Sequence, residues 1–530
     1  MRLRPYFKEQ IMLIINNVNL PLETDFLNLK SVMEGYLKTP LKTARLYKKS
    51  VDARKKDNVH FCCSVLVEAN NEQQLLRKNK NASVFNEKEY VNPVFTGEIK
   101  HRPVVVGFGP AGMFAALVLA RAGLKPLVLE RGQDADTRKA DVEEFFKGGP
   151  LKTDSNVQFG EGGAGTFSDG KLNTGIKDVR CRAVLKAFAQ FGAGDKILID
   201  AKPHIGTDVL INVVKNIRSE IISLGGEVCF NARLQKINTE NGEIISVTAG
   251  GREIPCDKVI LATGHSARDV FSTLKEMGVQ MAQKPFSMGV RIEHRQDDIN
   301  RALYGKFYNH PALSAADYKM AVHLNSGRGV YTFCMCPGGE VINSSSEEGG
   351  IAVNGMSQSR RDGENANSAL LVNVNPEDLE SSDIMAGCYL QQRVEKAAYN
   401  IANGAVPITT VGQLVYGEKA EITRVKPTVK PNYAFADFTG ILPSFITDSL
   451  KEALPLFDNK IKGFADSSAI LTAPETRSSS PIRILRDENY HSLSLCGLYP
   501  CGEGAGYAGG IMSAAVDGMR VAEQIVKDLM

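Results

Sequence analysis

The sequence predicts an α/β fold in which a parallel β-sheet domain is interrupted by a mainly antiparallel α+β domain. A β-branched strand, a glycine-rich turn and a helix follow one another from residue 104, and a similar succession ends the chain, which indicates the parallel sheet. Residues 281–455 lack a regular alternation of strands and helices, which indicates the insertion. With 530 residues, the chain has room for about three or four domains.

The composition is typical of a globular protein with a large core, since 43% of the residues are hydrophobic and 23% are charged. It excludes a disordered chain and a disulfide scaffold. The 63 basic and 60 acidic residues nearly cancel, so the net charge favours neither nucleic acid nor a membrane surface as a partner. The longest apolar tract, Met113 to Ala120, is too short to cross a membrane. Nothing in the sequence decides the number of subunits.

The first fifteen residues contain basic side chains but no small-residue cleavage site, so we expect no signal peptide and a cytoplasmic location. The ten cysteines would stay reduced in that compartment. Only one CxC pair is present, and no set of Cys and His has the spacing of zinc ligands, so no metal is expected.

Residues 1–95 are expected to form a separate, ferredoxin-like α/β module. The patterns predict a strand, a helix, two strands and a second helix, at Ile11 to Ile15, Thr24 to Leu37, Ala44 to Val51, His60 to Glu68, and from Asn71. The polar stretch 81–102 is expected to be a linker.

A dinucleotide-binding motif follows the linker. Gly107, Gly109 and Gly112 form GxGxxG between a buried strand and a helix. The first glycine permits the tight turn, the second lets the backbone approach a pyrophosphate, and the third lets helix and strand pack closely. The helix start also offers free N–H groups and a positive dipole to phosphates. Glu130 ends the next strand, 23 residues after Gly107, where a carboxylate can accept ribose hydroxyls.

Three further segments favour FAD as the dinucleotide. They are a glycine-rich loop at 160–175, a strand ending in Ala-Thr-Gly at 262–264, and a terminal strand, a turn with Glu503 and a helix near Gly510. The loop could form an anion-binding nest or be a simple surface loop. The terminal helix could stabilise the negative charge of a reduced flavin, or it could only pack on the sheet.

These features together resemble the Rossmann-like, two-domain FAD-binding fold of the glutathione reductase and hydroxybenzoate hydroxylase superfamily. Within it, the chain resembles the uncharacterised FAD-dependent dehydrogenases, also called NAD(FAD)-utilising dehydrogenases, over nearly its whole length. The segments that carry this resemblance are SVDARKK at 50–56, GEGGAGTFSDGKL at 160–172, FCMCPGG at 333–339, APETRSSSPIRILR at 473–486 and CGEGAGYAGGI at 501–511. The family's reaction is not settled, so the resemblance implies FAD but no particular substrate.

The FAD-binding domain would comprise residues 96–280 and 456–530, with 281–455 as an inserted substrate domain. Motif and resemblance together imply a set of FAD-site residues drawn from both parts. They are Gly107, Gly109, Pro110, Ala111, Gly112, Glu130, Arg131, Gly163, Gly165, Thr166, Gly170, Lys171, Leu172, Leu234, Ala262, Thr263, Gly264, Gly502, Glu503, Gly509, Gly510 and Ile511.

The sequence predicts an FAD-dependent oxidoreductase that transfers hydride between FAD and an unidentified small organic substrate. No second GxGxxG follows Arg131, so NAD(P)H would visit the flavin only transiently, or the organic substrate would itself be the hydride donor. The first helix lacks the CxxxxC of disulfide reductases, which disfavours their chemistry. A flavin monooxygenase, an FAD-dependent RNA-modifying protein and a non-catalytic flavin-binding partner are the alternatives. The RNA alternative rests on a basic cluster: Lys48, Lys49, Arg54, Lys55 and Lys56.

Cys334, Cys336 and His265 are the candidate catalytic residues. The CxC pair precedes a Pro-Gly-Gly turn, and a thiolate facing the flavin could act as acid, base or nucleophile. The alternative is an ordinary strand with packed sulfurs. His265 follows the Ala-Thr-Gly strand, where it could be catalytic or make a structural hydrogen bond. Four basic residues could bind an anionic substrate or only pair with acids: Arg291, Lys426, Arg477 and Arg483.

Overall fold

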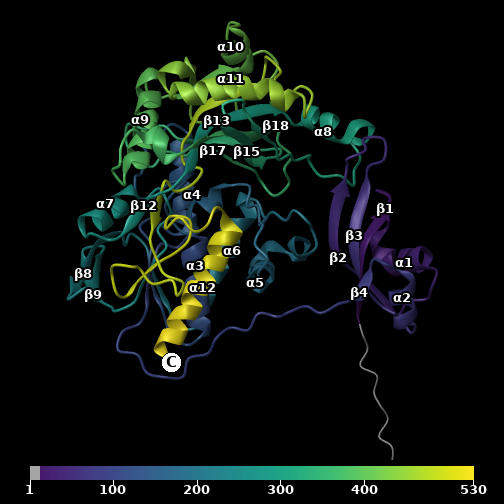
Figure 1. Ribbon diagram of the computed structural model, residues 1–530, viewed down its shortest axis with the longest axis horizontal. Coiled ribbons are helices and arrows are strands. Elements are labelled where there is room, and N and C mark those ends of the chain that lie inside the picture. The colour runs from purple at the N-terminus through teal and green to yellow at the C-terminus, as the bar shows by residue number, and fades with distance from the viewer. Residues whose placement is uncertain (1–11) are drawn as a thin grey trace, which may run out of the picture.

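The computed structural model describes residues 12–530 as three units, each with its own main β-sheet (Figure 1). The N-terminal module lies at one side, the parallel-sheet domain below and the antiparallel-sheet domain above. Residues 1–11 lie outside the described part, and with them the predicted strand start at Ile11 and most of the segment considered for a signal peptide.

The N-terminal module is a four-stranded antiparallel sheet in the order β2-β3-β1-β4, covered by two helices. This order and the βαββαβ succession are those of a ferredoxin-like fold, as predicted. Alternate residues of the central strand, such as Phe61, Cys63 and Val65, point into the core. The elements are β1 Leu13–Leu20, α1 Leu29–Leu37, β2 Thr43–Asp52, β3 His60–Glu68, α2 Glu72–Lys78 and β4 Ala82–Val84.

Two features of the module differ from the prediction. The strand β4 lies inside the stretch predicted to be linker, because a three-residue edge strand among polar neighbours gives no periodic signal. The strand β1 runs on to Leu20, since a bulge between Ile15 and Val18 absorbs the polar pair that seemed to end it.

The module is joined to the parallel-sheet domain by backbone hydrogen bonds as well as by ion pairs. The N–H of Lys49 donates to the carbonyl of Ile199 at 2.8 Å, and the N–H of Ala201 donates to the carbonyl of Lys49 at 2.8 Å. Glu87 accepts from Arg182 at 3.1 Å and from Lys186 at 3.2 Å. The sheet of the module is therefore extended at its edge strand β2 by one isolated parallel bridge, between Lys49 and Asp200 of the neighbouring domain.

The second domain is built on a five-stranded, fully parallel sheet in the order β23-β11-β5-β6-β7. One face packs against α3, α6 and α12, and the other against α7 and the strands β8 and β9, so the central strands are buried on both sides. This explains the continuous Val104–Val106 run. The strands are β5 Val104–Val106, β6 Leu127–Leu129, β7 Glu227–Cys229, β11 Val259–Leu261 and β23 Leu498–Pro500.

Helices lie between β5 and β6 and between β6 and β7, and a three-stranded meander lies between β7 and β11. The connection from β11 to β23 contains α7 and the whole antiparallel-sheet domain, and α12 follows β23. The helices are α3 Pro110–Arg121, α4 Ala135–Phe146, α5 Val179–Phe188, α6 Thr207–Ser223, α7 Arg268–Glu276 and α12 Ile511–Leu529. The meander strands are β8 Leu234–Glu240, β9 Glu243–Ala249 and β10 Arg252–Pro255. A Cβ at Gly518 of α12 would lie 2.0 Å from the carbonyl oxygen of Ala111, so glycine lets α12 and α3 pack closely.

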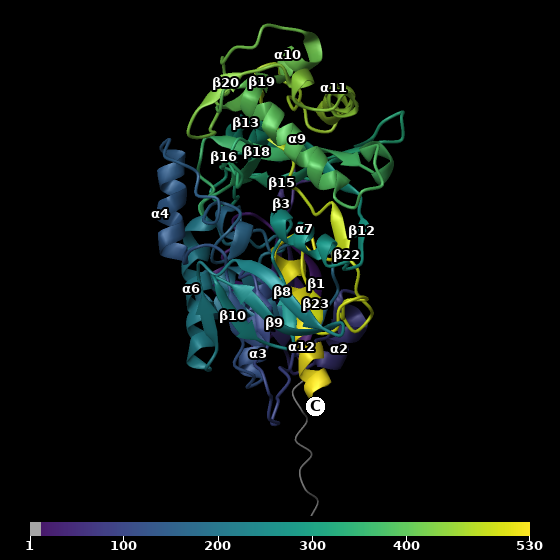
Figure 2. The same cartoon turned by 90° about the vertical axis from the view of Figure 1, so that its left-hand side faces the viewer.

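The third domain is a seven-stranded sheet in the order β14-β15-β18-β13-β21-β19-β20. Figure 2 shows β19 and β20 side by side at the top of this domain; this pair is parallel, and all other neighbours are antiparallel. The helix α11 packs across β13, β18, β15 and the edge strand β14. The strands are β13 Phe286–Arg295, β14 Ala321–His323, β15 Gly329–Cys336, β18 Asn365–Val374, β19 Val406–Thr410, β20 Tyr433–Phe435 and β21 Ile470–Glu475. The helices are α8 Gln296–Tyr304, α9 Ala386–Ile401, α10 Val411–Tyr416 and α11 Ser444–Asp458.

The antiparallel domain extends beyond residue 455, where the sequence suggested its end. The strand β21 pairs with β13 and β19, so the chain leaves this sheet only after Glu475. Its six residues are all buried and read equally well as a strand of a parallel sheet. Two small pairings complete the domain and its junction: β16 Glu340–Asn343 with β17 Val353–Met356, and β12 Met281–Gln283 with β22 Ile482–Ile484. Within residues 12–530, no helix is long and apolar enough to span a membrane.

Candidate functional site

The turn between β5 and α3 has the geometry of a pyrophosphate cradle. Gly107 has a φ of 97°, and a Cβ there would lie 2.5 Å from the carbonyl oxygen of Ala262. A Cβ at Gly112 would lie 1.9 Å from the carbonyl oxygen of Gly107. At Gly109 a Cβ would have only one neighbour, 3.7 Å away, and no side chain caps the helix that starts at Pro110. The free N–H groups of α3 therefore face an open side.

The carboxylate of Glu130 is buried beside this turn and holds three backbone segments together. It accepts hydrogen bonds from the N–H groups of Phe108 at 2.8 Å, Gly132 at 3.0 Å and Gly160 at 2.9 Å. A carboxylate has about four acceptor positions, so one is left for a ribose hydroxyl.

The glycine-rich loop joins the starts of two helices. Its 3-10 helix, Gly163–Phe167, lies against both: a Cβ at Gly163 would lie 2.9 Å from the Cα of Gly109, and one at Gly165 would lie 3.2 Å from Ile511 of α12. Gly162 and Gly163 have φ of 83° and 62°, the left-handed geometry that an N–H nest requires. Thr166 is buried and bonds to the carbonyl of Glu161. The loop thus turns its backbone toward the same place as α3 and α12.

The Ala-Thr-Gly segment and the terminal turn meet beside these helix starts. A Cβ at Gly504 would lie 2.5 Å from the carbonyl oxygen of Gly264, so residues 262–264 and 502–504 are in contact. The N–H of Gly502 donates to Asp517 of α12 at 2.7 Å. At Gly264, Gly509 and Gly510, an added Cβ would meet no atom within 4 Å. This open strip runs along the predicted flavin position, and α12 starts at its edge without a side-chain cap.

The geometry around these segments fits FAD. Two uncapped helix starts, an N–H nest, a carboxylate with a spare acceptor position and an open strip of glycine backbone face one another. Two predicted FAD contacts have other surroundings. Arg131 pairs with Asp269 at 2.6 Å, and Leu234 packs in the apolar core between β8 and the parallel sheet.

His265 has a protein partner at the end of the Ala-Thr-Gly segment. Its Nε2 lies 3.2 Å from the Oε1 of Glu503, the residue that the resemblance assigns to the ribityl chain of FAD. This contact joins the two segments and agrees with the structural alternative for the histidine.

The CxC pair lies at a break in strand β15. The register with β18 shifts between Phe333 and Cys336, and Cys334 has a φ of 42°. Such a bulge re-aims side chains and is common beside active sites. The thiol of Cys336 is buried and donates to the carbonyl of Cys334 at 3.2 Å, whereas Cys334 is partly exposed.

A buried guanidinium makes hydrogen bonds to the backbone of this bulge. Arg291 of β13 is fully buried, and its Nη2 donates to the carbonyl of Cys334 at 3.2 Å. Its Nη1 lies 3.8 Å from the Sγ of Cys336. The Nε donates to Glu475 at 2.7 Å. Burial raises the pKa of Glu475 to about 7, because it outweighs the attraction of Arg291.

The glycine-rich loop brings a second positive charge to the cysteines. The Nζ of Lys171 is shielded from solvent, lies 3.6 Å from Asp169 and has no hydrogen-bond partner within residues 12–530. Asp169 also accepts from Arg361 at 2.9 Å. The pKa of the Cys334 thiol falls to about 6, chiefly because the Cys336 thiol bonds to it, with Lys171 and Arg291 adding attraction. The pKa of Cys336 rises correspondingly.

Four of the charged residues around Cys334 have a position in the site that the sequence did not predict. Lys171 was predicted only as a cofactor contact and Arg291 only as an anion binder, while Glu475 was not singled out and Asp169 was unassigned. Asp169 and Lys171 stand in one polar loop, which is the only signal that could have indicated them. The remaining predicted residues of the loop, Gly170 and Leu172, pair with the segment 203–205 and fix the position of Lys171.

The other basic candidates do not join this group. Arg477 donates to Glu395 at 2.9 Å and shares that buried carboxylate with Arg268, so the pKa of Glu395 lies far below its usual range. Arg477 thus follows the acid-pairing alternative. The guanidinium of Arg483 lies 5.2 Å from the ring of Tyr507, and Lys426 is exposed.

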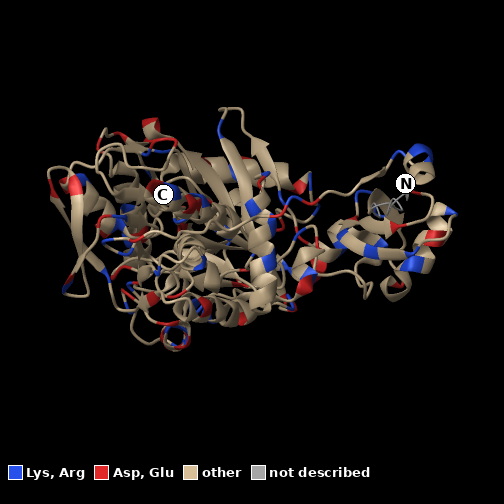
Figure 3. Cartoon of the chain, turned by 90° about the horizontal axis from the view of Figure 1, so that it is seen from below, with Lys and Arg blue, Asp and Glu red and all other residues tan. Residues whose placement is uncertain are grey.

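The basic cluster of the N-terminal module is partly used by the fold itself. Arg54 pairs with Asp52, and Lys49 lies 5.2 Å from the ring centroids of both Phe26 and Phe61. Figure 3 shows basic and acidic residues mixed over the module and the two larger domains.

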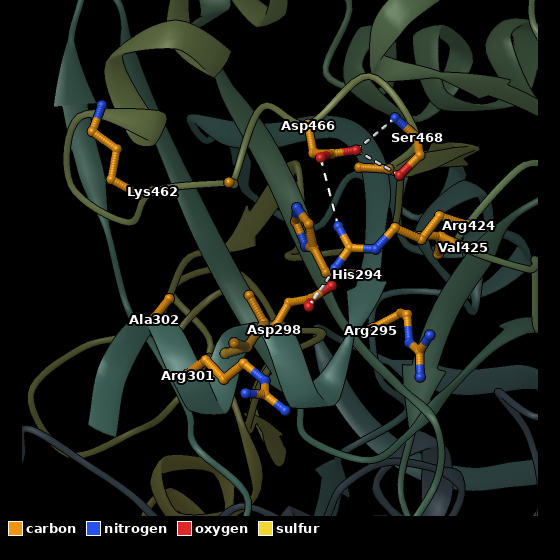
Figure 4. A pocket seen from close by; sticks show the side chains of 13 residues that line it. His294, Arg295, Asp298, Arg301, Ala302, Arg424, Val425, Lys462, Asp466 and Ser468 are labelled. Carbon is orange, nitrogen blue, oxygen red and sulfur yellow. Dashed lines mark hydrogen bonds and ion pairs between the residues drawn. The ribbon is translucent and has the colours of Figure 1, made fainter. Parts of the chain in front are cut away.

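A separate hollow of about 350 Å³ lies on the antiparallel domain, near the end of β13 (Figure 4). Its walls include Arg295, Arg301, Arg424 and Lys462, together with Asp298 and Asp466. Arg424 is held by both carboxylates, and none of the predicted site residues lines this hollow.

Comparisons with known proteins agree with the two larger domains. A family model described as pyridine nucleotide-disulphide oxidoreductase matches residues 101–270, and one described as FAD-dependent protein, C-terminal domain-like, matches residues 285–478. An uncharacterised protein of Clostridium beijerinckii is 47% identical over 523 residues, which cover 97% of this chain and 98% of the relative.

Solved structures with a similar chain course are far more distant. Glycine oxidase of Bacillus cereus shares 11% identity over 81% of this chain and 96% of its own, with a TM-score of 0.34. A geranylgeranyl bacteriochlorophyll reductase-like protein of Thermoplasma acidophilum shares 14% over 81% and 78%, with a TM-score of 0.37. Likenesses of this level say nothing about the reaction. The two family models and the close relative instead establish the family, and the chain is a member of the FAD-dependent oxidoreductases.

Proposed function

We propose that this enzyme transfers hydride between FAD and a small organic substrate that binds beside Cys334 and Lys171. The observation that carries the proposal is the meeting of two domains at that point. Lys171 and Asp169 come from the loop that begins at the FAD cradle, and Cys334 and Arg291 come from the antiparallel sheet. A substrate pocket at the junction of two domains is the common arrangement in such enzymes.

Each side chain has a role in this proposal. The ammonium group of Lys171, which lies 3.6 Å from Asp169 but makes no hydrogen bond within residues 12–530, attracts an anionic group of the substrate. Asp169, which also pairs with Arg361, fixes the position of the lysine. The Cys334 thiolate takes or delivers a proton at the reacting carbon. The start of α12 stabilises negative charge that develops beside Gly509 and Gly510. Bound FAD supplies the hydride acceptor or donor.

The proposal includes the narrower assignment to the NAD(FAD)-utilising dehydrogenases and a cytoplasmic location. All ten cysteines are free, which fits a reducing compartment. Between residues 12 and 530, the structure has one strand–GxGxxG–helix unit of the Rossmann type, so a nicotinamide cofactor would have to reach the flavin without a domain of its own.

The test is the visible spectrum of the purified protein before and after anaerobic addition of NADH or NADPH. Rapid bleaching of the flavin would support a nicotinamide-fed reductase, and the search would turn to electron acceptors. Flavin that stays oxidised with both, but bleaches with a carboxylate-bearing organic donor, would support the substrate as hydride source. A protein that takes up no flavin on reconstitution would overturn the proposal.

A further inference from the structure

Asn367 of β18 has a side-chain donor without a partner at the candidate site. The residue is fully buried, and its amide Nδ2 is shielded from solvent and makes no hydrogen bond within residues 12–530. Buried polar groups in folded proteins are almost always hydrogen-bonded, so such a donor needs an explanation. The roles proposed above leave this amide unused.

The amide lies beside the Cys334 bulge. Asn367 is the cross-strand partner of Cys336 in the register of β15 with β18. The Nη1 of Arg291 donates to the Oδ1 of Asn367 at 3.0 Å and to the carbonyl oxygen of Cys334 at 3.3 Å. One buried guanidinium therefore joins the amide to the backbone of the bulge.

The contact with Arg291 decides which end of the amide is free. A guanidinium has only donors, so the group of Asn367 that faces it is the oxygen. A Cβ at Gly355 of β17 would lie 2.3 Å from the same Oδ1, so the backbone of β17 covers this side. The nitrogen is the end of the amide that is left, and it can only donate.

The uncommitted polar groups around Cys334 are donors. Both nearby carboxylates are already engaged by arginines. The ammonium group of Lys171, 3.6 Å from Asp169, and the amide nitrogen of Asn367 make no hydrogen bond in the described part of the chain. A ligand that satisfies both has a carboxylate for the lysine and an oxygen with a lone pair for the amide.

The same groups distinguish a hydroxyl from an ammonium group. A hydroxyl can accept a hydrogen bond from Asn367 while it donates one to the Cys334 thiolate. An ammonium group has no lone pair, so it would leave the amide donor unsatisfied, and the charges of Lys171 and Arg291 would repel it. The arrangement therefore favours an oxygen over an amine on the reacting carbon.

We propose that Asn367 is a specificity-determining residue that donates to the oxygen of the reacting carbon, and that the substrates are a 2-hydroxy acid and the corresponding 2-oxo acid. This inference rests on the proposed function and names its substrate class. Lys171 acts on both thiols of the CxC pair, and Asn367 pairs with Cys336, so the two free donors surround the same short segment. Such an arrangement fits a carboxylate and an oxygen on neighbouring carbons.

The reaction balances as the transfer of one hydride and one proton. In oxidation, the O–H bond breaks and the Cys334 thiolate takes the proton. The C2–H bond breaks with its electron pair, which passes as hydride to oxidised FAD, and a C=O double bond forms. In reduction, C2 receives hydride from reduced FAD and the Cys334 thiol returns the proton to the oxygen. The N–H of Asn367 stabilises the negative charge that develops on this oxygen.

The first experiment compares acids that differ only in this substituent. Bleaching of the flavin is followed anaerobically with lactate and alanine, with malate and aspartate, and with 2-hydroxyglutarate and glutamate, each as both enantiomers. In the pair that reacts best, we expect the hydroxy acid to bleach the flavin about 10-fold faster or more. A faster amino acid would overturn the inference, as would no bleaching by any of the hydroxy acids.

The second experiment replaces the donor by an acceptor. Asn367→Asp keeps the size of the side chain and an oxygen for Arg291, so the ratio of the hydroxy-acid rate to the amino-acid rate should fall about 10-fold or more. Asn373→Asp, on the same strand, should keep the wild-type ratio. A ratio that stays the same in Asn367→Asp would exclude the amide from the substrate site.

A third measurement depends neither on turnover nor on the folding of a variant. The 2-oxo acid of the best-reacting pair should protect Cys334 of the FAD-loaded wild type from iodoacetamide, as measured by mass spectrometry. The acid of the same length without an oxygen on C2, such as propanoate for pyruvate, should protect it roughly 10-fold less well at equal concentration. Equal protection by the two acids would contradict the hydrogen bond to the oxygen.

The two proposals fail in different ways. Loss of FAD binding, read from the flavin absorbance, would end the proposed function. A protein that binds FAD and exchanges hydride with a substrate that has no oxygen on the reacting carbon would end only the assignment of Asn367 and of the 2-hydroxy acids.

Discussion

The carboxylate of Glu475 lies 2.7 Å from the guanidinium of Arg291, and both side chains are buried beneath the Cys334 bulge. Removing one partner of such a pair leaves an uncompensated buried charge, at a cost of about 3–5 kcal/mol. The pair therefore links the stability of the antiparallel sheet to the shape of the candidate site.

The pH dependence of stability should report this pair. Because the pKa of Glu475 is raised to about 7 in the folded protein, the folded state binds a proton that the unfolded state has lost between about pH 4.5 and 7. Its contribution to the free energy of unfolding is therefore greatest in acid and declines as the pH rises to 7. Thermal unfolding at pH 5, 6 and 7 should show this decline in the wild type relative to Glu475→Gln. Parallel pH profiles for the two proteins would contradict the raised pKa.

The Cys334 thiol should react at unusually low pH. Its charged neighbours are Lys171 and Asp169 from the loop, Arg291 from β13 and Glu475 from β21, with the thiol of Cys336 on its own strand. Alkylation of Cys334 by iodoacetamide should therefore reach half its maximal rate near pH 6 instead of near 9.

The charge of Lys171 contributes to that shift, so its removal gives a direct control. Lys171→Met should move the midpoint of Cys334 alkylation to higher pH, whereas Lys177→Met, at an exposed position of the same loop, should leave it unchanged. Mass spectrometry of the alkylated peptide separates Cys334 from the other cysteines. A midpoint unmoved by Lys171→Met would exclude the lysine from the thiol's surroundings.

Glu130 should be needed for FAD affinity. Its spare acceptor position would make one charge-assisted hydrogen bond to the ribose, worth about 1.5–3 kcal/mol, which corresponds to roughly 10- to 100-fold in the dissociation constant. Glu130→Ala should bind FAD that much more weakly by fluorescence titration. Glu243→Ala, at an exposed hairpin position, should bind it normally. Unchanged affinity in Glu130→Ala would remove the carboxylate from the site.

Alanine substitutions of two glycines in the GxGxxG motif should have different effects, one on the stability of the fold and the other on FAD binding. Gly107→Ala places a Cβ 2.5 Å from a backbone oxygen at a φ of 97°, so the fold itself should lose stability. Gly109→Ala adds a Cβ that meets the protein only at 3.7 Å, so the apoprotein should unfold at nearly the wild-type temperature while FAD binding weakens. Calorimetry of both apoproteins and FAD titration of Gly109→Ala separate the effects. Full FAD affinity in that variant would show that no phosphate lies against the turn.

Local sequence was enough to predict the parallel-sheet domain. The Val104–Val106 strand, the helix from Pro110 and the helix after Gly510 lie where the sequence puts them, since each is defined by neighbours in the chain. The assignment to FAD likewise followed from short motifs and is confirmed by the family matches.

The surroundings of Cys334 could not be predicted in the same way. Its neighbours come from segments that lie far apart in the chain: Asp169, Arg291, Arg361 and Glu475. Only the register of the seven-stranded sheet and the path of the glycine-rich loop bring these residues together. A pattern in one segment carries no information about a partner in another. The same reason hides β21, whose partners β13 and β19 decide that it belongs to the antiparallel sheet.

The segment 199–205 makes backbone hydrogen bonds both to the N-terminal module and to the glycine-rich loop, so the module is linked to that loop. One end exchanges two backbone hydrogen bonds with Lys49, and the other accepts from Leu172 at Pro203 and donates from Ile205 to Gly170. The residue between those two bonded positions of the loop is Lys171. A displacement of the module would therefore reach, through a few backbone hydrogen bonds, the lysine whose charge acts on the Cys334 thiol. Residues 12–84 thus support the conformation of the glycine-rich loop, and their deletion would increase the mobility of Lys171 in another domain.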